Sequence, residues 1–218
     1  MNKFDESGYY TMSMRECPSG AVRDNSDGKG RMDLLPGHAL LVVHSMVDTH
    51  WPDATMALAK IFEKGANHYA ARNWEQGMFV DWFIDSGQRH LEKAIAGWDD
   101  EPHLFMALWN FMCLVDTVSR VQKGLLSEDY LGHYTNLSKD TYLFPVSPLC
   151  DPDVDTLLHW AKYDIHNVLA GGDFRYASMA AIYLYEVADR FARAKRLGNP
   201  EGLGILTTLF SKEGSFVI

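Results

Sequence analysis

Apolar residues recur at helical spacing from Leu35-Pro36 onward and predict a chain of helices joined by short polar links. The first two helices are expected around residues 40–47 and after Asp53, which is placed to cap the second. A loop around residues 72–77 follows them. The apolar positions of these helices are Leu40, Leu41, Val43, Met46 and Val47, then Met56, Leu58, Ala59, Ile61 and Phe62.

The third and fourth helices are expected at about residues 81–98 and 102–123. Only a few residues join them, so they should pack antiparallel as neighbours. Pro102 begins the fourth helix and Gly124 follows its end. The inward positions are Ile84, Gly87, Leu91, Ala94, Ile95 and Trp98 on the third helix, and Leu104, Ala107, Leu108, Phe111, Val115 and Val118 on the fourth.

Two further helices follow a connector at residues 125–150. The fifth begins at Asp151-Pro152 and ends before Gly171-Gly172, and Asp173 caps the sixth. Residues 1–32 have no apolar period and predict an irregular arm, and no strand pattern stands out. The prediction is an all-α helical bundle: an irregular N-terminal arm (1–32), a helical domain (33–124) and a C-terminal helical extension packing on it (125–218).

The charge balance argues against a nucleic-acid partner, because 20 Lys and Arg face 29 Asp and Glu, a formal net charge of −9. A small anionic ligand such as a nucleotide stays compatible with this charge, because a local cluster of Arg and Lys or a bound metal can make the electrostatic potential positive inside one cleft. Cys17, Cys113 and Cys150 are too far apart for a zinc motif or a disulfide framework, and Cys113 fits core packing. The polar N-terminus and the absence of 18 consecutive apolar residues favour a cytoplasmic protein with no membrane partner.

Polar residues concentrate where the third helix meets the fourth. His103 and Asn110, seven residues apart, share one helical face that can look across at the third helix. Carboxylates gathered with His and Asn predict a site for Mg²⁺ or Mn²⁺. The candidate ligands are Asp85, Glu92, Asp99, Asp100 and Glu101, and the candidates for catalysis or ligand orientation are His90, His103 and Asn110.

Purely structural interpretations of the same residues stay open. Three of the acids, Asp99, Asp100 and Glu101, come just before a helix. The helix dipole and capping stabilise acidic side chains at that position without any metal. Asp85 with Arg89 has the spacing of an ordinary surface ion pair. A second cluster, Glu186 with Asp189, could face Asp155 or Asp164, although neighbouring arginines suit surface pairing equally well.

Four blocks of sequence, taken in order, resemble a known family. They are Asp27-Gly28-Lys29-Gly30-Arg31-Met32-Asp33-Leu34-Leu35-Pro36, the run from Lys64 to Gly77 (KGANHYAARNWEQG), Arg89-His90-Leu91, and the run from His103 to Asn110 (HLFMALWN). The series is similar to a phage-associated family named for dATP/dGTP diphosphohydrolase, related in function to MazG-type all-α nucleotide pyrophosphatases. The similarity covers about residues 27–120.

This resemblance implies an all-α nucleotide pyrophosphatase-like bundle that forms a homodimer or higher oligomer and works in the host cytoplasm if phage-encoded. It implies Mg²⁺-dependent hydrolysis of a purine deoxynucleoside triphosphate to the monophosphate and pyrophosphate. The positions that match the family are Lys29, Arg31, Tyr69, Asn73, Trp74, Arg89, His90, His103 and Asn110. The chain departs from the family in a shorter acidic loop at residues 97–101 and in Met106, where a second His is common.

The expected mechanism is metal-assisted attack of water on the α-phosphorus. Lys29, Arg31, Arg72 and Arg89 are candidates for phosphate contact. Tyr69, Asn73 and Trp74 complete the candidate substrate-binding set, the last two for the sugar or base. A non-catalytic nucleotide-binding or protein-interaction module is the alternative, favoured by the shortened loop and by Met106.

Overall fold

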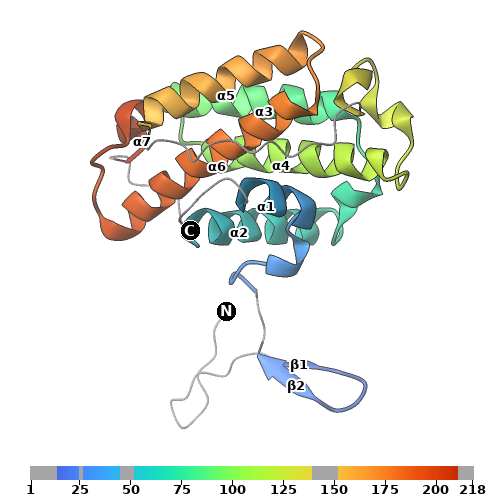
Figure 1. Ribbon diagram of the computed structural model, residues 1–218. Coiled ribbons are helices and arrows are strands. Elements are labelled where there is room, and N and C mark those ends of the chain that lie inside the picture. The colour runs from blue at the N-terminus through green and yellow to red at the C-terminus, as the bar shows by residue number, and fades with distance from the viewer. Residues whose placement is uncertain (1–13, 25–26, 45–51, 139–151, 211–218) are drawn as a thin grey trace.

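The computed structural model describes residues 14–24, 27–44, 52–138 and 152–210, and most of its regular structure is helical (Figure 1). The all-α prediction is confirmed. Met46, Val47, Cys150 and Asp151, which the sequence placed in helices or a connector, lie outside the described residues. The main helices are α1 (Gly37–His44), α2 (Asp53–His68), α3 (Val80–Ile95), α4 (His103–Gln122), α5 (Val154–Leu169), α6 (Phe174–Leu197) and α7 (Thr207–Phe210).

Short 3₁₀ turns precede α1 or lie between the later helices: η1 (Met32–Leu34), η2 (Asn73–Gln76), η3 (Glu128–Leu131), η4 (Thr135–Ser138) and η5 (Gly204–Leu206). Helices α4 and α6 pack together at the centre, with α3 and α5 on one side and α1 and α2 on the other (Figure 1). Among the described residues α4 is the one helix long and apolar enough to span a membrane, but 83% of its apolar window is buried. The apolar residues of α4 therefore pack in the core of the bundle.

Helices α3 and α4 are neighbours, as their short link predicts. Gly87 permits their close approach, since a Cβ at this position would lie 2.8 Å from the ring of Phe111. Leu91 and Ala94 on α3 are buried, as expected, whereas Trp98 is 54% exposed. The helix ends at Ile95 and Gly97 takes a positive φ of 74°, so the chain turns before Trp98 can extend the apolar stripe.

The cap of α6 lies where the sequence predicts it, whereas α5 is capped by Asp153 and begins at Val154, after the predicted Asp151-Pro152, and the predicted cap of α2 is wrong. The Asp173 carboxylate accepts the Arg175 backbone N–H at 3.0 Å, which confirms its predicted capping of α6. Asp53 does not cap α2, because it is the first helical residue and its carboxylate binds Arg196 at 2.6 Å. Instead, the Ala54 backbone N–H donates to Asp189 on α6 at 3.2 Å. A cap supplied from a distant helix leaves no local sequence signal.

The N-terminal arm is more regular than predicted. Strands β1 (Met14–Glu16) and β2 (Val22–Asp24) form an antiparallel hairpin in which Arg15 pairs with Arg23. The hairpin stands clear of the helices (Figure 1). Val22 is 58% exposed, so the strands lack the buried alternate positions that reveal a strand in sequence. The expectation of an arm without strands is therefore wrong for these residues.

Residues 28–31 of the arm are tied to helix α2. The backbone N–H groups of Gly28 and Gly30 each donate to the buried Glu63 carboxylate at 2.8 Å. Gly30 has a φ of +88°, and a Cβ there would lie 3.0 Å from Ala59. Glycine is required at position 30 both by this backbone conformation and by this contact. Glu63 thus anchors the segment that leads into the bundle.

Replacing Glu63 with Ala should release this segment. Hydrogen bonds to a charged acceptor stabilise by about 1.5–3 kcal/mol each, so amide exchange at Gly28 and Gly30 should accelerate at least tenfold. Hydrogen-exchange NMR measures this directly, with the exposed Glu201→Ala as the control variant. Unchanged exchange in Glu63→Ala would show that Glu63 does not hold the arm.

Candidate metal centre

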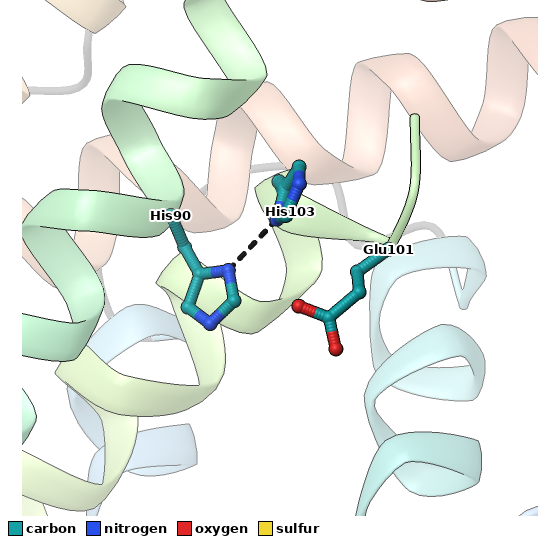
Figure 2. Close-up of side chains that lie close together, drawn as sticks. All are labelled: His90, Glu101 and His103. Carbon is teal, nitrogen blue, oxygen red and sulfur yellow. Dashed lines mark hydrogen bonds between the residues drawn. The ribbon is translucent and has the colours of Figure 1, made fainter. Parts of the chain in front are cut away.

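Three side chains capable of binding a metal meet where α3 approaches the start of α4. His90 comes from α3, His103 is the first residue of α4, and Glu101 lies in the link between them (Figure 2). One ligand atom from each lies within 4.8 Å of the others. Both histidines are buried and Glu101 is exposed, so the group has a protected side and an accessible side. Within the described residues this is the one His, Cys, Asp or Glu group with such spacing.

A hydrogen-bonded chain runs through the two histidines. His103 Nε2 lies 2.7 Å from Asp100 Oδ1, and His103 Nδ1 lies 2.8 Å from His90 Nδ1. An ionised carboxylate can only accept, so His103 Nε2 carries the proton and donates it. With a neutral His103, its Nδ1 then presents a lone pair toward His90. Asp100 therefore selects the tautomer of His103.

The surroundings of the two histidines keep Asp100 ionised and disfavour charge on His90. The pKa of Asp100 is lowered, first by the hydrogen bond from His103 and further by the positive charge of Lys93. The Lys93 ammonium lies 3.6 Å from the Asp100 carboxylate. Burial lowers the pKa of His90, and the neighbouring His103 adds to that effect. A neutral imidazole is the form that binds a metal.

The donor set fits a divalent transition metal. Two nitrogens bound to one ion at about 2.1 Å each lie on the order of 3 Å apart, close to the spacing of the two Nδ1 atoms, and a metal bound to both would displace the proton of this hydrogen bond. Metal-bound histidines commonly donate their other N–H to a carboxylate, as His103 does to Asp100. Two imidazoles with one carboxylate suit Mn²⁺ or Zn²⁺ better than Mg²⁺, which prefers oxygen ligands.

The other predicted acids lie in different surroundings. Asp85 is exposed and pairs with Arg89 at 2.6 Å, and Glu92 pairs with Lys162 of α5 at 2.7 Å. Neither belongs to the group of possible ligands around His90. Asp99 is half-buried in the same link as Asp100. Asn110 is buried, and its Nδ2 donates to the Met106 carbonyl at 2.8 Å, within α4 itself.

A cavity of about 340 Å³ adjoins the metal-binding group. Glu101 belongs to both, so the accessible carboxylate of the group also forms part of the cavity wall. Most of the lining is apolar, and Phe62 packs against both Trp74 and Trp109, with ring centroids 6.0 and 5.8 Å away. The lining residues are Leu34, Ile61, Phe62, Lys64, Gly65, Ala66, His68, Tyr69, Ala70, Arg72, Asn73, Trp74, Met78, Glu101, Pro102, Met106 and Trp109.

Four of the residues expected to bind substrate line this cavity: Tyr69, Arg72, Asn73 and Trp74. Trp74 is buried in the wall, whereas Tyr69 is 72% exposed. Arg72 has a positive φ of 60° and is held by Glu75 and by the Asp33 carbonyl. Its guanidinium already has anionic and carbonyl partners.

The other three predicted contacts are not part of the cavity lining. Lys29 is exposed in the turn that Glu63 anchors, and Arg31 is paired with Asp33 at 2.6 Å. Arg89 pairs with Asp85 along the outer face of α3. A second, open depression of about 480 Å³ includes Asp85 and Arg89, together with Trp82 and Leu169.

Several residues near the site were missed by sequence reasoning. Lys64 and His68 line the cavity from the end of α2. The spacing of Lys64 and His68, four apart just before Tyr69, was an available signal, because such residues share a helical face. Lys93 was also missed, and its position against Asp100 depends on how the link folds back on α3.

The alternative acidic cluster on α6 does not assemble. Glu186 pairs with Arg190 at 2.8 Å, as the ion-pair interpretation predicted. Asp189 accepts from Ala54 of α2, while Asp155 on α5 accepts the Ile205 backbone N–H at 2.8 Å. These carboxylates make separate contacts rather than forming one site.

Comparison with known proteins links part of the chain to one family. Residues 19–125 match a family model described as dATP/dGTP diphosphohydrolase, N-terminal. The match includes His90, Glu101 and His103 and every residue that lines the cavity. No curated protein and no solved structure matches the chain.

Proposed function

Because residues 19–125 belong to the dATP/dGTP diphosphohydrolase N-terminal family, we propose that this chain hydrolyses a purine deoxynucleoside triphosphate to the monophosphate and pyrophosphate. The family description identifies a hydrolase and names dATP and dGTP. The observation that carries the proposal is the His90, Glu101 and His103 group at the edge of a cavity large enough for a small ligand. Glu101 belongs both to this group and to the cavity lining.

The proposed metal ligands are His90 and His103 through their nitrogens and Glu101 through its carboxylate. A bound divalent cation would neutralise phosphate charge and lower the pKa of the attacking water. In the reaction, water oxygen bonds to the α-phosphorus, and the bond from that phosphorus to the oxygen bridging to the β-phosphate breaks. Pyrophosphate leaves with the electron pair of that bond, and the proton lost by the attacking water passes to solvent.

Side chains around the group have separate proposed tasks. Asp100 holds the proton on His103 Nε2, which keeps Nδ1 directed toward His90. Lys64, an exposed cation of the cavity lining, is placed to contact phosphate, and Arg72 is a second candidate. The apolar walls exclude water from the bound nucleotide, which strengthens these electrostatic contacts.

Product analysis tests the reaction. Purified protein is incubated with each deoxynucleoside triphosphate and either Mn²⁺ or Mg²⁺, and the phosphate products are separated. We expect pyrophosphate and the monophosphate from dATP and dGTP, with faster turnover in Mn²⁺ because of the nitrogen-rich ligands. Inorganic phosphate or triphosphate would place the cut at another bond. Tight nucleotide binding without turnover would instead favour the non-catalytic module.

Replacing Asp100 with Asn should weaken the centre without removing a ligand. Loss of a carboxylate behind a metal-bound histidine typically costs about 10- to 100-fold in metal affinity or activity, and we expect a loss in that range. Metal titration by calorimetry and initial rates measure both effects. The exposed Asp81→Asn variant, on the other end of α3, serves as the control. A fully active Asp100→Asn enzyme would show that the tautomer of His103 has no role.

A further inference from the structure

We infer that the cavity beside the metal group receives the purine ring of the nucleotide and that Asn73 recognises the edge of that ring. The inference rests on the proposed function and extends it to the choice of base. The aromatic rings of Phe62, Trp74 and Trp109 line the cavity. Aromatic surface stabilises a flat heterocycle by stacking and burial but offers nothing to a phosphate.

The position of the cavity fixes the direction of the nucleotide. Glu101 belongs both to the cavity lining and to the group with His90 and His103. With the base inside the aromatic walls, the triphosphate must leave through the polar edge. Lys64 and Glu101 are charged lining residues, and both are exposed. This places the phosphates next to the proposed metal ligands, as hydrolysis requires.

Asn73 is the polar side chain best suited to recognise the base. Among the polar lining residues, Arg72 is already held by Glu75 and the Asp33 carbonyl, and Glu101 belongs to the metal group. Lys64, His68 and Tyr69 are exposed. Asn73 is half-buried in η2, directly before the buried Trp74. It is the one Asn or Gln among the lining residues.

The chemistry of a primary amide predicts how a change at Asn73 alters the choice of purine. An amide offers a donor and an acceptor side by side, so it matches N6–H and the adjacent ring nitrogen of adenine and, turned over, the O6 acceptor and N1–H donor of guanine. A carboxylate only accepts, so it matches the N1–H and N2–H donors of guanine and gives the ring nitrogen of adenine no donor. We therefore expect Asn73 to accept both purines, and Asn73→Asp should move the preference toward guanine.

The test uses nucleosides without phosphates or metal, so that base binding is separated from hydrolysis. Deoxyadenosine and deoxyguanosine are titrated into the full chain in the presence of a chelator, with tryptophan fluorescence and calorimetry as readouts. Relative to the wild type, Asn73→Asp should shift the ratio of the two affinities toward deoxyguanosine on the order of tenfold. Asn67→Asp adds the same charge at an exposed position of α2 outside the lining and should leave the ratio unchanged.

A second variant tests the cavity itself. Ala66 lines the space, and Ala66→Phe should fill it and weaken the binding of both nucleosides by at least tenfold. Circular dichroism and thermal melting establish that the variant is folded. Nucleoside binding unaffected by Ala66→Phe, a base preference unaffected by Asn73→Asp, or no nucleoside binding to the wild type would each overturn the inference. Nucleoside binding with these responses but no triphosphate hydrolysis would instead refute the proposed reaction alone.

Discussion

Replacing His103 with Ala should reduce hydrolysis of dATP and dGTP by at least about 100-fold. His103 contacts one other proposed ligand and the acid that orients it, since its two nitrogens lie 2.8 Å from His90 and 2.7 Å from Asp100. Its removal takes away one proposed ligand and the partner that orients the other. Initial rates with saturating Mn²⁺, and metal affinity by calorimetry, should fall together.

His103 is almost fully buried, so the variant must be shown to be folded. Glu101→Gln provides an independent test, because Glu101 is exposed and its amide replacement leaves the core unchanged. It should lose metal affinity and activity while melting at the wild-type temperature. His159→Ala, at an exposed position of α5, should retain full activity. If both His103→Ala and Glu101→Gln hydrolysed the triphosphates at the wild-type rate, the proposed metal centre would be refuted.

Replacing Asp164 with Asn should stabilise the protein at alkaline pH. Asp164 on α5 is buried, and burial raises its pKa from 3.8 to about 7. The unfolded chain therefore releases this proton at lower pH than the folded chain does. The free energy of unfolding therefore decreases as pH rises from about 4 to about 7, and the decrease stays at its full size above that range. The shift corresponds to about 4 kcal/mol as an upper value.

The Asn variant carries no ionisable group and escapes this cost. Urea denaturation at pH 8 should show a higher unfolding free energy than for the wild type, by up to about 4 kcal/mol. At pH 4 the two proteins should differ little. Asp81→Asn on α3 is exposed and should show no such pH-dependent gain. Equal stability of Asp164→Asn and wild type at pH 8 would contradict the burial argument.

The sequence predicted the helices well because most of their determinants are local. Apolar spacing located α3 to α6, and the Asp173 cap lies at the predicted position. The cap of α2 could not be predicted, since Asp189 supplies it from 135 residues away. The arm hairpin was missed because its exposed three-residue strands carry no apolar alternation.

The site was predicted only in part, for a geometric reason. The short link between α3 and α4 implied that His90 and His103 could meet, and they do. Asp85 precedes His90 by five residues, which turns it about 140° around the helix, so it lies on the outer face with Arg89. That angle was available from sequence. The contact of Lys93 with Asp100 was not, because it depends on the path of the link.

Locating the metal tests the proposed centre most directly. Crystals grown with Mn²⁺ and a non-hydrolysable dATP analogue would reveal the ion by its anomalous scattering. We predict a peak about 2.1–2.2 Å from a nitrogen of His90, a nitrogen of His103 and a carboxylate oxygen of Glu101, with the phosphates beside it. A peak at another cluster, such as Asp81 and Asp85, with these three side chains unligated, would contradict this prediction.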